Sequence, residues 1–345
     1  MKIKKLLCSI LSAALIAVPF MSGCSSTGSG ETSLPFIGNV NNLNFNNPRQ
    51  SDIVTPQPSF TGGSEITPAV WKAENASGNY IYLMGTIHMG DDSVYNMPSY
   101  VNAAYDYCDS IAVEADIDSV MNDPQKLQDL AYSLIYLDGT TIADHVSAET
   151  YKGMVDLLKS NNAYMEQYDL EKPFLWQALL SQQIPIHTNL SIDKGVDMVF
   201  LKKAKNDGKS ILEVENIDFQ IEMFNSFSDG LNDLMLAEFI KPDYAEFAQK
   251  GLEEIYTRWK TGTVDETLVY STTFDNMTEE NRVYYEEYND KLLTKRNQGM
   301  AKAAEQYIDN GQKVFYMVGT LHFYGSNGII QLLKNDGYTI TQMTA

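Results

Sequence analysis

Two heptapeptides near opposite ends of the chain are almost the same. Residues 82–88 read Tyr-Leu-Met-Gly-Thr-Ile-His, and residues 316–322 read Tyr-Met-Val-Gly-Thr-Leu-His. The chain has four histidines, and two of them, His88 and His322, end these copies. Each apolar run predicts a buried strand with a histidine at its carboxyl end. Ligands of open α/β sheets collect at the carboxyl ends of strands, so we expect His88 and His322 to share one site.

The alternative for each histidine is a core imidazole that is satisfied by a backbone group. That explanation is favoured for a single histidine, whereas the repeat favours a functional pair. His145, after Ile142-Ala-Asp144, and His187, after Pro185, lie in no such context. Both are expected to be surface residues rather than ligands.

Two glutamates end other apolar runs. Glu114 ends Ile111-Ala-Val-Glu, and a carboxylate there is costly to bury unless it is paired or used. It is expected to be a metal ligand or a general base, the alternative being an edge carboxylate that reaches water. Glu215 ends Ile211-Leu-Glu-Val-Glu, but Glu213, two residues earlier, would point to the same face of the strand. The pattern therefore leaves Glu215 open between a site residue and a surface one.

Three further polar residues are candidates for the site. Arg296 could clamp a carboxylate or stabilise an oxyanion, or it could be a surface arginine. Asp197 begins a helix, where it would interact with the helix N-terminus or line the site. Gln220 begins the helix after Glu215 and could orient substrate or cap the turn.

These residue types indicate hydrolysis by activated water, because no serine or cysteine nucleophile motif is present. Two imidazoles and one or two carboxylates match the ligand set of a catalytic metal with an open position. The metal would lower the pKa of its bound water and polarise a carbonyl. In the metal-free alternative, a His–Glu pair deprotonates water directly.

The first residues are typical of a targeting segment. Three lysines within residues 2–5 precede an apolar run over residues 6–20, and Ser22-Gly23-Cys24 completes a pattern that resembles a bacterial lipobox. We therefore expect residues 1–23 to be a signal peptide and Cys24 to be acylated. The exported protein would then be anchored to the outer face of the bacterial cell membrane. An ordinary secretory signal or an uncleaved anchor is the alternative.

Composition separates the rest of the chain into a tether and a domain. Residues 24–66 are rich in Ser, Gly, Thr, Asn and Pro and predict a flexible tether, followed by one domain over 67–345. Cys108 is the one cysteine of that domain, so we expect a buried apolar thiol and no disulfide. The net charge of −20 would become −23 without the three signal lysines. Such a domain is a poor partner for nucleic acid or anionic lipid.

Strands and helices are predicted to alternate along the domain. We expect strands at 80–87, 110–114, 210–215, 313–321 and 338–343, and helices at 98–107, 124–137, 147–159, 173–183, 195–206, 216–260, 275–310 and 327–335. This order predicts an α/β fold with a central, mostly parallel or mixed β-sheet and flanking helices. The largely helical middle would form an insertion or cap over the sheet.

The ordered set of motifs resembles the TraB/PrgY/GumN family, which includes the animal Tiki proteases. The resemblance runs from about residue 80 to residue 341. The family's two Gly-x-x-His motifs look like Gly85-Thr-Ile-His88 and Gly319-Thr-Leu-His322, and its strand-end glutamate looks like Glu114. Further similar segments are Leu137-Asp-Gly-Thr-Thr141, Lys172-Pro173, Gly195-Val-Asp197, Glu215 with Gln220, Arg296-Asn297, Gly325-x-x-Gly328-Ile and Gly337-Tyr338.

The resemblance implies a fold related to erythromycin-esterase-like and haem-binding ChaN-like proteins. For the Tiki relatives it implies metal-dependent proteolysis with manganese or cobalt, and zinc is a further candidate here. We expect His88, His322, Glu114 and Glu215 as metal ligands, with Arg296 also catalytic. Substrate, a peptide or a small molecule, would contact Asp197, Gln220 and Asn297.

The chain departs from the family pattern at two places. Phe323-Tyr324 follows the second motif where many relatives have an aliphatic pair, which leaves the shape of the pocket open. Glu215 stands in Val-Glu-Asn rather than the common Leu-Glu-Thr. Two other functions stay open: a metal-independent esterase-type hydrolase, and a non-enzymatic protein that binds a peptide or haem.

Overall fold

A computed structural model of the chain describes residues 66–183, 188–270 and 278–343. The expected signal peptide, nearly all of the expected tether, Cys24 and His187 lie outside these residues. Ile66, the first described residue, is already buried in the core. Among the helices of the described segments, none is both long enough and apolar enough to cross a membrane.

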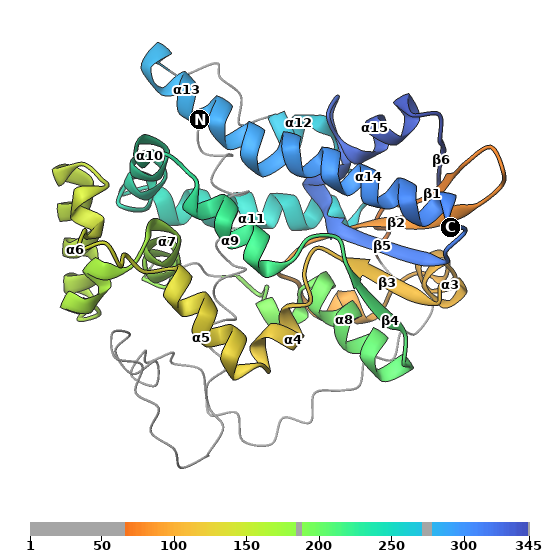
Figure 1. The fold of residues 1–345 in the computed structure, drawn as a ribbon, viewed down its shortest axis with the longest axis horizontal. Coiled ribbons are helices and arrows are strands. Elements are labelled where there is room, and N and C mark those ends of the chain that lie inside the picture. Colours follow the sequence, from red (N-terminus) through yellow and green to blue (C-terminus); the bar gives the residue numbers. More distant parts are fainter. Residues whose placement is uncertain (1–65, 184–187, 271–277, 344–345) are drawn as a thin grey trace.

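A six-stranded mixed sheet forms the centre of the fold (Figure 1), with strand order β4-β3-β5-β2-β1-β6. The strands are β1 (Val70–Glu74), β2 (Tyr80–Thr86), β3 (Ser110–Val113), β4 (Ser210–Glu213), β5 (Val314–Gly319) and β6 (Thr339–Gln342). Strands β4, β3, β5 and β2 are parallel neighbours, whereas β1 is antiparallel to both β2 and β6. The predicted α/β class and the mostly parallel, mixed sheet are thus confirmed.

Strand β1 was not predicted from the sequence. It forms a hairpin with β2 through a tight turn in which Asn75 and Asn79 are joined by a backbone hydrogen bond of 2.9 Å. Gly78 in this turn has a φ of 83°, a conformation that favours glycine. Met343 also donates a backbone hydrogen bond to Val70, so β1 is held in the sheet by the C-terminal strand as well.

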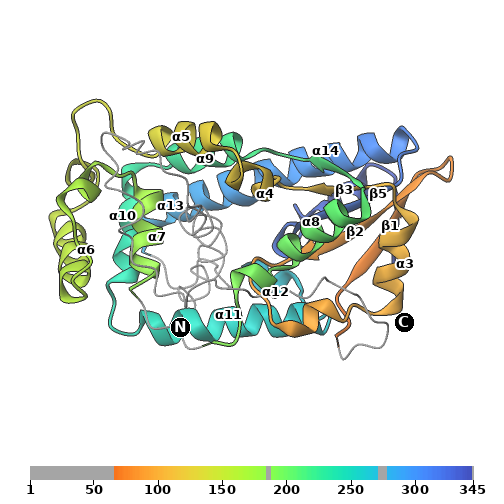
Figure 2. The ribbon, with the colours of Figure 1, turned by 90° about the horizontal axis from the view of Figure 1, so that it is seen from below.

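Helices cover both faces of the sheet. One face packs on α3 (Ser99–Tyr107), α8 (Val196–Asp207) and the second half of α11 (Tyr244–Lys260), where Val101, Phe200 and Trp259 are buried. The other face packs on α14 (Lys295–Asp309) and α15 (Ile329–Asn335), which bury Met300 and Leu333. Figure 2 shows α11 and α14 running along opposite sides of the molecule.

The middle of the chain forms a helical cap with its own core, as predicted. It comprises α4 (Ile117–Met121), α5 (Pro124–Ser133), α6 (Ala148–Ser160), α7 (Pro173–Ser181), α9 (Ile217–Asn225), α10 (Asp229–Phe239) and α13 (Glu279–Asn289), while α12 (Glu266–Tyr270) follows α11. In Figure 1 the cap helices α6, α7 and α10 lie at the end of the molecule away from the sheet. Trp176 is completely buried in this cap core.

Two long helical segments join the cap to the sheet. Helix α11 buries Tyr244 in the cap core and Trp259 in the sheet core. Helices α13 and α14 are continuous through one π-helical segment, Asp290–Thr294. Such π segments change which side chains face a site and are frequent near functional residues. Here the segment immediately precedes Arg296 and Asn297.

Candidate active site

Four neighbouring parallel strands each deliver one polar side chain to the same edge of the sheet. Across the order β4-β3-β5-β2, the residues that follow the strands are Glu215, Glu114, His322 and His88. The carboxyl ends of parallel strands meet at one edge, and these four side chains therefore gather there. The strands of the two repeated heptapeptides, β2 and β5, are adjacent, with Thr86 paired to Gly319.

The glycines of the repeated motifs permit close packing at this edge. A Cβ atom on Gly85 would lie 2.5 Å from Oγ1 of Thr320. A Cβ atom on Gly319 would lie 3.0 Å from Oε1 of Glu114 and 3.3 Å from Cδ2 of His322. The backbone N–H of Gly319 donates a 2.6 Å hydrogen bond to that same Oε1 atom. Gly319 thus fixes Glu114 against the second histidine motif.

Arg296 joins the two glutamates. Its Nη2 lies 2.6 Å from Oε2 of Glu114 and 2.8 Å from Oε2 of Glu215, and its Nε donates to both oxygens of Glu215. The amide Nε2 of Gln220 donates to Glu114 at 3.1 Å and to Glu215 at 3.2 Å. Arg296 was expected to clamp a carboxylate, to stabilise an oxyanion or to lie at the surface, and it lies in a buried network with two carboxylates.

The network keeps the carboxyl group of Glu114 ionised. Burial alone would raise the pKa of Glu114, but the charge of Arg296 and the N–H of Gly319 oppose it, and the pKa falls to about 2. For Arg296, burial lowers the pKa, whereas Glu114 and Glu215 raise it above its usual range. Glu114 is therefore a permanent anion at neutral pH, held in one orientation.

His88 is oriented by Asp197. Its Nδ1 lies 3.0 Å from Oδ2 of Asp197, in the first turn of α8, so a proton on Nδ1 is donated to the carboxylate. The α8 terminus approaches closely, because a Cβ atom on Gly195 would lie 2.5 Å from the backbone oxygen of His88. Val196 also donates a backbone hydrogen bond to Ile87. The contact with Asp197 occupies Nδ1 of His88, and its Nε2 has no hydrogen-bond partner in the described part of the chain.

His322 is oriented by Asn297. Its Nδ1 lies 2.6 Å from Oδ1 of Asn297, whose Nδ2 donates to the backbone oxygen of Asn327. This second bond fixes the amide so that Oδ1 is the acceptor, and His322 therefore carries its proton on Nδ1. The Nε2 lone pair is left beside Glu114, 3.9 Å from its Oε1. Asn297, expected to contact substrate, thus contacts a site histidine.

The two imidazoles have opposite pKa shifts. Burial lowers the pKa of His88, but the charge and hydrogen bond of Asp197, together with the charge of Glu114, outweigh it, and the net shift is upward. For His322, burial and then Arg296 lower the pKa to about 3. Opposite shifts in one site separate a residue that can exchange protons near neutral pH from one that stays neutral.

The donor set meets a metal's requirements only in part. Both imidazoles offer Nε2 while Nδ1 is held by a carboxylate or an amide, which is the arrangement seen around metal-bound histidines. However, both oxygens of Glu215 bind Arg296, and those of Glu114 bind Gly319 and Arg296. Over residues 66–183, 188–270 and 278–343, no three His, Cys, Asp or Glu side chains are arranged to hold a metal ion.

Other polar candidates lie outside this site. Glu213 is exposed at the end of β4, where it accepts a hydrogen bond from the backbone of Asp116. His145 belongs to the cap, where it is partly buried, stacks on Tyr136 and bonds to Thr140 and Asp229. It is therefore less exposed than the sequence analysis expected.

Cys108 is buried and free, as predicted.

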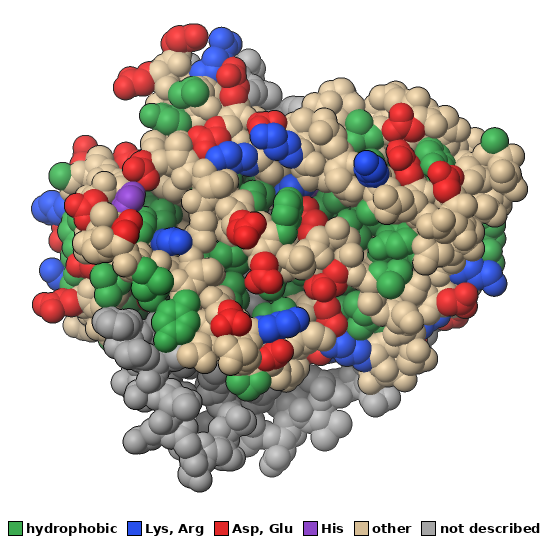
Figure 3. Space-filling view, viewed as in Figure 1, with side chains coloured by type: hydrophobic (Ala, Val, Ile, Leu, Met, Phe, Trp, Pro, Cys, Tyr) green, Lys and Arg blue, Asp and Glu red, His purple; other side chains and the backbone are tan. Residues whose placement is uncertain are grey.

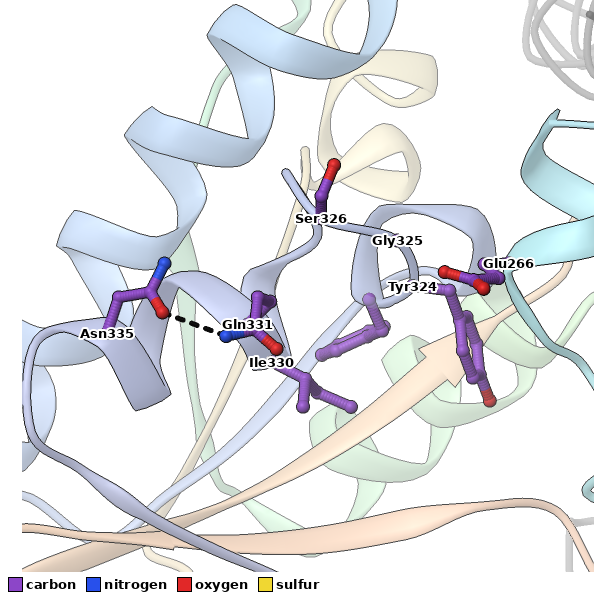
Figure 4. A pocket seen from close by; sticks show the side chains of 8 residues that line it. Glu266, Tyr324, Gly325, Ser326, Ile330, Gln331 and Asn335 are labelled. Carbon is purple, nitrogen blue, oxygen red and sulfur yellow. Dashed lines mark hydrogen bonds between the residues drawn. The ribbon is translucent and has the colours of Figure 1, made fainter.

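The residues after His322 shape a neighbouring pocket. Phe323 stacks on Trp71 of β1 at 5.4 Å, and Tyr324 meets the same ring edge-on at 5.8 Å. Phe323 and Tyr324 also line a pocket, shown in Figure 4, together with Glu266, Ser326, Ile330, Gln331 and Asn335. Phe323 and Tyr324, which stand where many relatives have an aliphatic pair, thus pack on β1, a strand that was not predicted.

A mixed α/β domain with paired Gly-x-x-His motifs at the carboxyl edge of its sheet defines the class of this protein. The chain belongs to the TraB/PrgY/gumN family, whose model matches residues 69–342. This identification confirms the resemblance derived from the motifs. Neither the curated proteins nor the solved structures contain a match to the chain.

Proposed function

We propose that the protein is a hydrolase that cleaves peptide bonds with water activated by His88. The observation that carries the proposal is the His88–Asp197 contact of 3.0 Å, which occupies Nδ1 and leaves Nε2 of His88 with no partner among the described residues. Glu114 and His322 are close enough to interact electrostatically with this histidine. A histidine held in this way by a carboxylate is suited to general-base catalysis.

In the proposed reaction, Nε2 of His88 accepts a proton while the water oxygen attacks the substrate carbonyl carbon. Asp197 stabilises the imidazolium that forms, because its carboxylate faces Nδ1. The imidazolium then donates the proton to the leaving nitrogen as the C–N bond breaks. The products are a carboxylic acid and an amine.

His322 and Glu114 support this step as fixed hydrogen-bond acceptors. His322 stays neutral with its proton on Nδ1, so its Nε2 can hold the attacking water but cannot donate to it. Arg296 and Gln220 are positioning residues in this scheme, because both act through Glu114.

The test compares His88→Ala with His145→Ala on a mixed peptide library, using the full-length protein. Loss of His88 is expected to lower turnover by at least about 10²-fold, since general-base catalysis supplies that order of rate. His145→Ala is a matched control because, among the described residues, the hydrogen-bond and stacking partners of its ring belong to the cap. Circular dichroism checks that both variants are folded. Full activity in folded His88→Ala protein would overturn the proposal.

A metal-dependent peptidase is the second candidate, favoured by the two unblocked Nε2 atoms. Manganese, cobalt or zinc would be held by His88 and His322 and would supply Lewis-acid activation of water. The test is elemental analysis after dialysis against trace divalent metals, with the His88→Ala/His322→Ala variant alongside. About one equivalent of metal, lost in the variant, would select this candidate. Chelator-resistant turnover would reject it and leave the direct mechanism.

We further propose that a lipid on Cys24 anchors the exported domain to the outer face of the bacterial membrane. The support is the lysine-rich start, the apolar run and Ser22-Gly23-Cys24. Replacement of Cys24 by Ser is expected to move the protein from the membrane fraction to the soluble one. Unchanged membrane association in that variant would argue against acylation at this cysteine.

A further inference from the structure

We infer that the substrate carries a positively charged amino group close to the bond that is cleaved, as a peptide with a free amino terminus does. The inference deepens the proposed hydrolase function and rests on it. It is carried by two properties of the site: an excess of negative charge and buried oxygen atoms that lack a donor.

The charge of the site is unbalanced. Three carboxylates, those of Glu114, Glu215 and Asp197, face one guanidinium, that of Arg296. These four groups sum to a formal charge of −2. Arg296 already bonds to two of the carboxylates, and the third, Asp197, bonds to His88. A substrate cation would reduce this excess, whereas a substrate anion would increase it.

Gln220 supplies the first unsatisfied acceptor. Its Nε2 donates to two carboxylates, which fixes the orientation of the amide because Oε1 would be repelled there. Only 3% of the residue is exposed, and Oε1 is buried with no hydrogen-bond partner within the described segments. Oε1 and Nε2 are bonded to the same amide carbon, so this oxygen lies next to the nitrogen that binds both site glutamates.

Asp197 supplies the second unsatisfied acceptor. Its Oδ2 bonds to His88, while its Oδ1 is buried and has no partner among the residues that the structure describes. Leaving a buried acceptor unpaired is unfavourable. One such atom belongs to the Glu114–Glu215 network and the other to the His88 contact, and each favours a bound group that brings a donor.

An ammonium group fits these requirements better than other peptide groups. It carries three N–H donors and a positive charge, whereas a backbone amide carries one donor and a carboxylate carries none. The His88 and Asp197 side chains are 16% and 13% exposed, against 7% for Arg296 and 8% for Glu215. Substrate is therefore expected to enter on the His88–Asp197 side.

The surface charge is consistent with delivery of cationic substrates. The chain has a net charge of −20, and Figure 3 shows acidic side chains spread over the face in view. A field of this sign attracts cations to the protein and repels anions. This property assists the encounter, whereas the unsatisfied acceptors determine recognition at the site.

The experiment uses the full-length protein and a peptide library prepared in two forms, with free and with acetylated amino termini. Free-amine members are expected to be cleaved at least ten times faster, judged by kcat/KM. Equal or faster cleavage of acetylated members would overturn the inference and leave the hydrolase proposal intact. Absence of cleavage in both forms would overturn the proposed function, and the inference with it.

A variant of Gln220 distinguishes a contact with the substrate amino group from positioning of Glu114. Gln220→Leu removes the unsatisfied oxygen, so the ratio of free-amine to acetylated cleavage is expected to fall. If Gln220 only positions Glu114, both rates would fall by the same factor and the ratio would stay constant. A constant ratio in folded Gln220→Leu protein would therefore overturn the assignment of this oxygen as an ammonium contact.

Discussion

Nη2 of Arg296 lies 2.6 Å from Oε2 of Glu114, and both side chains are nearly inaccessible to solvent. Removing two charges from water is expensive, and the cost is offset only when each charge keeps its partners. Glu114 therefore depends on Arg296 for its ionised state, and the site depends on Glu114 for one of its fixed acceptors.

Replacing Arg296 by Ala is expected to lower the free energy of unfolding by about 3–5 kcal/mol, since two carboxylates lose their partner in the interior. Denaturant unfolding followed by circular dichroism measures this change. Arg282→Ala is the matched control, because Arg282 is half exposed and its ion pairs are longer than 3.5 Å. Equal stability of the two variants would mean that the Arg296 network does not stabilise the fold.

The same pair predicts a dependence of stability on pH. The pKa of Glu114 is lower in the folded protein, at about 2, than its ordinary 4.5, so the folded state binds the proton less tightly. The stabilisation is therefore complete above pH 4.5 and is lost as the pH falls toward 2. In Arg296→Ala this loss is expected to shrink, and unfolding curves at several acidic pH values would detect the difference.

Replacing Asp197 by Asn is expected to shift the pH–rate profile. Burial lowers the pKa of His88, whereas the charge and hydrogen bond of Asp197 raise it, so removing the charge lowers this pKa. A general base must be deprotonated, and the acid limb of kcat/KM should therefore move to lower pH. The maximal rate should also fall, by up to roughly 10⁴-fold, because the imidazolium loses its partner. A limb that stays in place would show that His88 is not the titrating base.

Glu171 in the cap predicts the opposite dependence of stability on pH. Burial raises the pKa of Glu171 to about 8, and its Oε2 has no partner among the described residues. The folded state thus binds this proton more tightly, and stability falls as the pH rises from 4.5 toward 8, by roughly 1.4 kcal/mol per pH unit at most. Glu171→Gln should remove this loss, so its advantage over the parent protein should grow with pH.

The control for Glu171 is Glu166→Gln, a change at an exposed glutamate five residues earlier. This variant is expected to follow the parent protein at every pH. Thermal unfolding between pH 5 and pH 8 compares the three proteins. A constant difference between Glu171→Gln and the parent protein would show that Glu171 is ionised in the folded state.

Local pattern was enough to predict which residues reach the site edge. An apolar run that ends in His or Glu is readable in the sequence, because burial of a strand requires continuous apolar residues and leaves the polar residue at its end. His88, Glu114 and His322 were predicted in this way, and the structure places them together at one edge. Glu215 could not be separated from Glu213, because the strand end at Glu213 depends on its pairing with β3.

The alternation of strands and helices, the helical cap, the family and the residues that follow the parallel strands can be read from the amino-acid sequence. Three other features required the folded structure: that Arg296 bonds to two glutamates, that Asp197 and Asn297 set the protons on His88 and His322, and that β1 joins the sheet. The spacing of apolar residues shows which positions of a helix or strand are buried, and this spacing is a property of the local sequence. The partner of a buried charge or imidazole lies in another segment of the chain, 25 residues away for His322 and Asn297 and 109 for His88 and Asp197, and it therefore appears only when the chain is folded.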